Sequence, residues 1–122
     1  MSGGSLIQHV NGHAIGRLHP ITIYGIFNTS VEITSTHHQM MFPYSINKDK
    51  YEIVATATNY LSNTYLDGID QEKELPANFE ECEIVYYKNS KSLCIQGHPE
   101  MAACPDYTKQ MCLEMISYYL KI

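Results

Sequence analysis

The feature that most constrains this chain is a change of hydrophobic period near residue 106. Before that point, short runs rich in β-branched and aromatic residues alternate with turn-type residues, which is typical of strands and hairpins. After it, apolar residues recur at intervals of three and four, which is typical of an amphipathic helix. The sequence therefore predicts a sheet covered by one C-terminal helix.

The runs that we expect to form strands are residues 21–27, 31–35, 51–58, 83–87 and 92–96. Asn28-Thr29-Ser30 separates the first two runs and the polar segment 88–91 separates the last two, so each pair indicates a hairpin. The most polar stretch, residues 59–81, contains Asp67-Gly68 and Leu75-Pro76, which interrupt regular structure. We expect it to be a long loop or insertion within one domain.

The C-terminal helix is expected to begin at Asp106 as its N-cap. The Asp106 carboxylate can accept hydrogen bonds from the free N–H groups of the first turn, and Pro105 cannot extend the helix backwards. The apolar positions of this segment are Tyr107, Met111, Cys112, Met115, Ile116, Tyr119, Leu120 and Ile122. We interpret this stripe as core packing against the sheet and not as a cofactor site.

The charge composition argues against two classes of binding partner. The 122 residues carry 8 Lys and Arg against 13 Asp and Glu, a formal net charge of −5, so we expect neither nucleic acid nor a membrane surface as partner. No apolar run approaches the roughly 20 residues that a membrane helix needs. The N-terminal residues lack the basic and apolar regions of a secretion signal, and a cytoplasmic location is expected.

Cysteine and histidine spacing argues against disulfides and metal. No cysteine pair has C-x-x-C spacing, and a chain of this size can bury a core without disulfides, so we expect free thiols at Cys82, Cys94, Cys104 and Cys112. His9 and His13 lie four residues apart, but Asn11-Gly12 between them is turn chemistry. The adjacent His37 and His38 would point to opposite sides of a strand. No metal site and no cofactor are expected.

The most informative segment follows the last expected strand. The expected strand ends at Gly97. His98 and Glu100 follow it two residues apart, and Pro99 between them restricts the backbone. A carboxylate beside an imidazole fixes its tautomer and stabilises the imidazolium, as in nucleophile–His–acid triads. The spacing alone equally fits a strand end with a solvated His and Glu.

Three motifs in this sequence resemble one family. Gln96-Gly97-His98-Pro99-Glu100 closely resembles the Q-x-H-P-E signature of class I glutamine amidotransferases, which include the γ-glutamyl peptide hydrolases. Ser35-Thr36-His37-His38-Gln39 resembles the S-x-H-H-Q segment on the wall of the family's glutamine pocket. Residues 3–10 with Gly12-His13 resemble the G-G-x-L-x-Q-x-V stretch that follows its nucleophile helix. The motifs occur in the family's order and span nearly the whole chain.

The resemblance implies an α/β, flavodoxin-like fold with a mainly parallel sheet. Residues 1–122 would form part of that domain: the later strands, antiparallel hairpins and the last helix. In the family, the attacking cysteine lies on a G-x-C-x-G turn shortly before the G-G-x-L stretch, and the glycine-rich loop expected to supply the oxyanion hole also precedes that stretch. Neither feature lies within these residues, so we expect both from outside them.

No cysteine of this chain matches that nucleophile. Cys82 lies between Glu81 and Glu83, whose negative charges disfavour a thiolate. Cys94 lies within an expected buried strand, and Cys104 and Cys112 lie at and within the expected helix.

The first functional expectation is the C-terminal part of a class I glutamine amidotransferase-like hydrolase. As the resemblance implies, a thiolate from the missing part would attack glutamine or another γ-glutamyl amide. His98 would act as general base and then acid, Glu100 would orient it, and His37, His38 and Gln39 would shape the substrate pocket. A partial domain would expose a sheet edge, so a complementing segment or subunit, or a homo-oligomer, is the expected partner. The alternative is a non-catalytic binding or regulatory protein.

Overall fold

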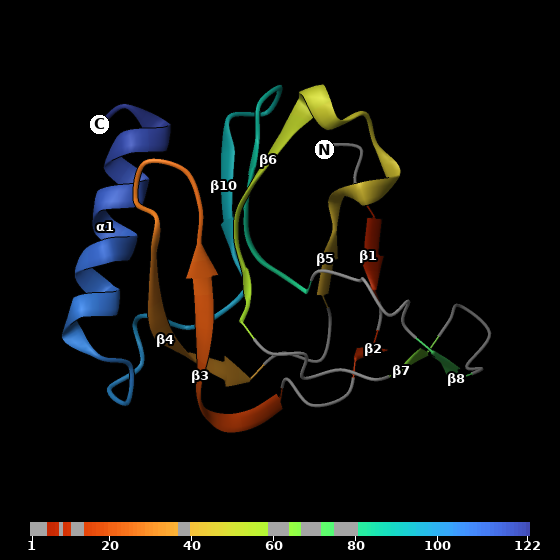
Figure 1. Ribbon diagram of the computed structural model, residues 1–122, viewed down its shortest axis with the longest axis horizontal. Coiled ribbons are helices and arrows are strands. Elements are labelled where there is room, and N and C mark those ends of the chain that lie inside the picture. Colours follow the sequence, from red (N-terminus) through yellow and green to blue (C-terminus); the bar gives the residue numbers. More distant parts are fainter. Residues whose placement is uncertain are drawn as a thin grey trace.

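An antiparallel five-stranded sheet forms the centre of the structure (Figure 1). The computed structural model describes residues 5–7, 9–10, 14–36, 40–58, 64–66, 72–74 and 81–122. The strand order is β10-β9-β6-β3-β4. The strands run over β3 (Ala14–Ile23), β4 (Thr29–Thr36), β6 (Tyr51–Ala57), β9 (Cys82–Tyr87) and β10 (Ser92–Ile95).

Shorter elements surround this sheet. The two-stranded sheet pairs β1 with β5, and the three-stranded sheet has the order β2-β7-β8. Two short 3₁₀ helices, η1 and η2, lie between β5 and β6. Their bounds are β1 (Ser5–Ile7), β2 (His9–Val10), β5 (Met40–Phe42), η1 (Pro43–Ser45), η2 (Lys48–Lys50), β7 (Thr64–Leu66) and β8 (Glu72–Glu74).

The five expected strands and both expected hairpins are present, but their boundaries differ most at the first pair, where β3 begins at Ala14, well before the expected start at residue 21. β3 ends at Ile23, before the expected end at residue 27, and β4 already begins at Thr29. The reason is the turn between them, in which Gly25 has φ 76° and Asn28 has φ 34°. These left-handed conformations favour Gly and Asn and end the extended run early.

The helix α1 (Asp106–Leu120) confirms the expected change of period, but its cap differs from the prediction. The N-cap residue is Pro105, without a side-chain capping bond, and Asp106 lies in the first turn. There its negative charge still interacts favourably with the positive end of the helix dipole. At the other end Lys121 adopts the left-handed conformation and its N–H donates to the carbonyl of Ser117.

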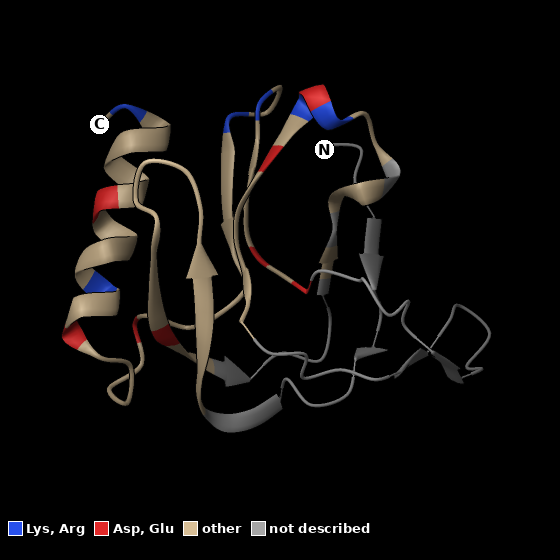
Figure 2. Cartoon of the chain, viewed as in Figure 1, with Lys and Arg blue, Asp and Glu red and all other residues tan. Residues whose placement is uncertain are grey.

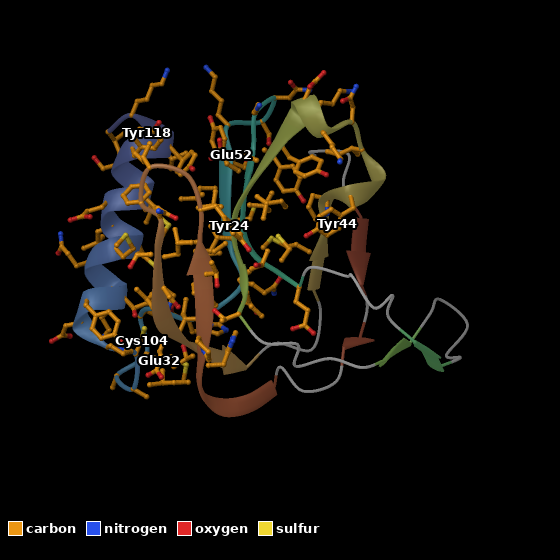
Figure 3. The ribbon with its side chains drawn as sticks, in the orientation of Figure 1. Tyr24, Glu32, Tyr44, Glu52, Cys104 and Tyr118 are labelled. Atoms are coloured by element: carbon orange, nitrogen blue, oxygen red, sulfur yellow. The ribbon has the colours of Figure 1, made fainter. Side chains whose placement is uncertain are left out.

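The sheet buries apolar side chains on two sides. On one side, strand residues pack with Cys104, Met115 and Tyr119 from α1 and the segment before it. On the other side, Tyr51, Cys82, Val85 and Tyr87 pack against Met41 from β5 and against Tyr44 and Ile46 from the segment between β5 and β6. Figure 3 shows these two layers, with Cys104 and Tyr118 on the helix side and Tyr44 on the opposite side.

The chain therefore combines a sheet with a helix, as expected for the broad α/β class. Each strand pairing among the described residues is antiparallel. Within the expected long loop, residues 59–81, the structure places β7 and β8, each of three residues. Glu81 then leads into β9, and the rest of that stretch lies outside the described residues.

Candidate functional site

The two edge strands of the five-stranded sheet meet through the segment that follows β10. Although β10 and β4 lie at opposite ends of the strand order, Gly97 lies directly against β4. A Cβ atom on Gly97 would lie 2.6 Å from Cδ1 of Ile33 and 2.9 Å from the carbonyl oxygen of Thr34. The sheet therefore curls, and only glycine allows this close approach without displacement of β4.

His98 and Glu100 form the pair that the sequence predicts. The Nδ1 atom of His98 and the Oε1 atom of Glu100 lie 2.8 Å apart, and the two side chains are 42% and 69% exposed. With Nδ1–H as the donor, Nε2 carries the free lone pair and can accept a proton. The exposed fraction leaves the ring open to an incoming group.

The contact with His98 changes the pKa of the Glu100 carboxyl group. The hydrogen bond from His98 is the main cause that lowers the pKa of Glu100 below its ordinary value. Lysines are not among the causes, because Lys88 and Lys91 lie in the turn before β10, whereas Glu100 follows its other end. Figure 2 shows the blue residues of that turn and of η2 together at the end of the molecule away from the start of α1.

The backbone of His98 is held by β4. The hydroxyl of Thr34 donates to the His98 carbonyl oxygen at 2.7 Å, and the Met101 N–H donates to the same oxygen at 3.2 Å. Thr34 is 1% exposed, so its hydroxyl is enclosed beside this carbonyl. Thr34 is not recognisable as a site residue from the sequence, because its place in an alternating strand gives no indication of a contact made 64 residues later.

Gln96 links the same segment to two other elements. Its N–H donates to the Glu83 carbonyl oxygen at 2.8 Å, and its Oε1 accepts from the Met41 N–H at 3.0 Å. Gln96 thus fixes the end of β10 between β9 and β5. The motif match singled out Gln96, but only the folded structure identifies this anchoring contact.

The predicted pocket residues His37, His38 and Gln39 lie outside the described residues. They follow β4, whose Thr34 contacts His98, directly in the sequence. Of the predicted site residues, the structure thus brings His98 and Glu100 together.

The four cysteines are free thiols. Burial raises the pKa of Cys94 and Cys104, and it raises the pKa of Cys112 to about 11. Cys82 is fully buried. Because the thiolate is the nucleophilic form, these surroundings disfavour attack by Cys94, Cys104 or Cys112.

A buried ion pair lies deeper in the sheet. The Nε2 atom of His19 on β3 and the Oε1 atom of Glu83 on β9 lie 3.6 Å apart, and both side chains are almost fully enclosed. The sequence alone suggests that His19-Pro20 only leads into a strand. The structure corrects this, because His19 lies inside β3 and its side chain is part of the interior.

The described part of the chain contains neither a metal-binding cluster nor a membrane-spanning helix. No group of three or more His, Cys, Asp or Glu side chains there is arranged to hold a metal ion. No helix there has the length and apolar character to cross a membrane.

Comparisons of this chain with family models, with curated proteins and with solved structures find no significant match.

Proposed function

We propose that residues 1–122 are the C-terminal part of a cysteine-dependent hydrolase of γ-glutamyl amide bonds, of the class I glutamine amidotransferase type. In this proposal, His98 is the general base and acid, and Glu100 orients it. The catalytic thiol and the oxyanion-hole donors come from a segment or subunit outside these residues. That complement would supply the parallel strands of a flavodoxin-like sheet, beside the antiparallel strands described above.

The observation that carries the proposal is the 2.8 Å contact between Nδ1 of His98 and Oε1 of Glu100. It leaves Nε2, the nitrogen that exchanges the proton in a nucleophile–His–acid triad, available on a partly exposed ring. The hydrogen bond from Thr34 to the backbone of His98 adds support, because it brings the residue just before the Ser35-Thr36-His37-His38-Gln39 motif against the Gln96–Glu100 motif.

The chemistry follows from these positions. His98 takes the thiol proton on Nε2, and the thiolate attacks the γ-carbonyl carbon of the substrate. The tetrahedral intermediate collapses as Nε2 returns the proton to the leaving amine, which leaves a thioester. Water then attacks the thioester while Nε2 accepts its proton. That proton returns to the thiol as the C–S bond breaks, and the γ-carboxylic acid that is released gives up its own proton to the solvent. Throughout, the Glu100 carboxylate stabilises the imidazolium.

The test is glutamine hydrolysis by the chain together with whatever polypeptide accompanies it in its native cells. The tagged chain is purified under non-denaturing conditions, and ammonia release from glutamine is measured. We expect activity that falls about 100-fold or more in His98→Ala. Ser92→Ala, at the other end of β10, is the matched control and should retain full activity. Full activity in His98→Ala would overturn the assigned role.

The source of the thiol is tested separately with a diazoketone analogue of glutamine, which alkylates a catalytic cysteine. Mass spectrometry should place the label on a cysteine outside residues 1–122. Labelling of Cys82, Cys94, Cys104 or Cys112 would contradict the proposal that the nucleophile is supplied from elsewhere.

A second candidate function is a non-catalytic binding or regulatory protein. The raised pKa values of Cys94, Cys104 and Cys112 favour it, since these residues alone offer no activated thiol. It predicts that the purified native material has the 13.9 kDa mass of the chain, no cysteine-bearing companion and no glutaminase activity.

A further inference from the structure

Thr34 is the described residue that connects the two halves of the candidate site. It lies on β4, ahead of the segment that contains His37, His38 and Gln39. Its hydroxyl donates to the backbone carbonyl of His98 at 2.7 Å. The contact therefore joins the backbone of the proposed acid–base residue to the strand that leads into the proposed pocket segment.

The Thr34–His98 hydrogen bond lies beyond the residues of β10 that pair with β9. The last contact of this segment with β9 is the hydrogen bond from the Gln96 N–H to the Glu83 carbonyl. Beyond it, the close approach of Gly97 to Ile33 and Thr34 and the hydroxyl of Thr34 determine where the backbone lies.

Holding the His98 carbonyl constrains the ring indirectly. With hydrogen bonds from Thr34 and Met101, the plane of the peptide bond between His98 and Pro99 is fixed. The proline ring fixes the next backbone angle, φ of Pro99. The backbone between the His98 ring and the Glu100 carboxylate is thereby partly fixed, and the two groups meet at 2.8 Å.

We propose that Thr34 is a positioning residue that holds His98 in the tautomer with a protonated Nδ1 and a free Nε2. It acts through the backbone of His98 and does not touch the substrate. This inference rests on the proposed function for its catalytic meaning. Its test measures the free chain, so that it can fail or succeed independently of glutaminase activity.

The experiment is nuclear magnetic resonance of the ¹⁵N-labelled 122-residue chain, in which the ring nitrogens of His98 report the tautomer ratio. Thr34→Val removes the hydroxyl and keeps the shape, and Thr34→Ser keeps the hydroxyl. The matched control is Thr108→Val, because Thr108 is equally buried and its hydroxyl donates to a backbone carbonyl of β4, that of Glu32, at 2.6 Å.

We expect the Nδ1-protonated form of the His98 ring to predominate in the wild-type chain and in the Thr34→Ser and Thr108→Val variants. In Thr34→Val we expect the ratio of Nδ1-protonated to Nε2-protonated ring to fall at least threefold and the titration midpoint of Glu100 to rise. An unchanged ratio in Thr34→Val, or an equal fall in Thr108→Val, would overturn the positioning role.

If Thr34→Val does not fold, Thr34→Ala replaces it, because the smaller side chain creates no steric conflict. The same threefold fall is then expected, with Thr34→Ser still resembling the wild type. A fall in Thr34→Ser as large as that in Thr34→Ala would show that the hydroxyl is not responsible and would contradict the proposal.

Discussion

At the residue scale, three restraints on the backbone at residues 97–99 help to hold His98 and Glu100 in their observed relation. Pro99 restricts one angle, Thr34 and Met101 fix the peptide plane, and Gly97 permits the backbone to lie against β4. Each of these contacts can be removed by one substitution.

Gly97→Ala should destabilise the protein by about 1–3 kcal/mol, because the added methyl overlaps Ile33 and the Thr34 carbonyl oxygen. Urea denaturation measures the change. Combining it with Ile33→Val, which removes the nearest atom but not the carbonyl, should restore only part of the loss. A Gly97→Ala protein as stable as the wild type would show that β4 does not press against residue 97.

The hydrogen bond from His98 predicts a pH effect. Because it favours the ionised form, the pKa of Glu100 in the folded protein lies below its value in the unfolded chain. Its stabilising contribution is therefore present above the ordinary carboxyl range and is lost as the pH falls through the lowered pKa.

His98→Ala should raise the titration midpoint of Glu100 toward its ordinary value, as measured by carboxyl ¹³C resonances. Ser92→Ala, whose hydroxyl donates to the Ser90 carbonyl oxygen at the other end of β10, should leave it unchanged. A midpoint that stays low in His98→Ala would assign the shift to another cause.

At the element scale, α1 is held against the sheet by its buried face. Met115 is 0% exposed within the cluster shared with the strands, whereas Leu113 on the same helix is 61% exposed. Met115→Ala should cost about 2–5 kcal/mol. Leu113→Ala should change stability by less than about 0.5 kcal/mol. Equal losses in thermal or urea unfolding would contradict this packing.

The ion pair between His19 and Glu83 links β3 to β9 across β6 inside the sheet. Removing one member costs roughly 1–3 kcal/mol, because the other member loses this polar contact in a poorly solvated place. His19→Leu and Glu83→Leu should each destabilise the protein by an amount of this order. The double variant should lose at least about 0.5 kcal/mol less than the sum. Additive losses in urea unfolding would show that the two side chains are not coupled.

At the scale of the whole molecule, the fold encloses its thiols. Cys82, Cys104 and Cys112 are buried, and the pKa of Cys112 is raised to about 11. At pH 7 the folded chain should therefore react with a disulfide reagent much more slowly than the unfolded chain, in which all four thiols are accessible. Reaction of one cysteine in the folded protein faster than in the unfolded chain would identify an activated thiol that our proposal does not contain.

Local pattern was sufficient for the strands of the five-stranded sheet and for α1, but not for the shorter elements around that sheet. Alternating apolar and polar residues placed the strands, and the three-and-four spacing placed α1, because these periods follow from backbone geometry alone. It failed where a turn or a helix end depends on the backbone conformation of single residues. The β3–β4 turn begins at Tyr24 because Gly25 takes a positive φ. The cap of α1 is Pro105, one residue earlier than the Asp106 that the capping rule selected.

The pairing of His98 with Glu100 also follows from the sequence, since two residues separated by a proline cannot lie far apart in space. Three contacts join positions that lie 55 to 64 residues apart in the sequence: Thr34 with His98, Gln96 with Met41, and His19 with Glu83. The order of the strands and the curl of the sheet determine which of these distant side chains meet. The sequence by itself thus determined the strands of the five-stranded sheet, α1 and the His–Glu pair. Only the tertiary structure decided how that pair is supported, because contacts between distant strands leave no periodic trace in the chain.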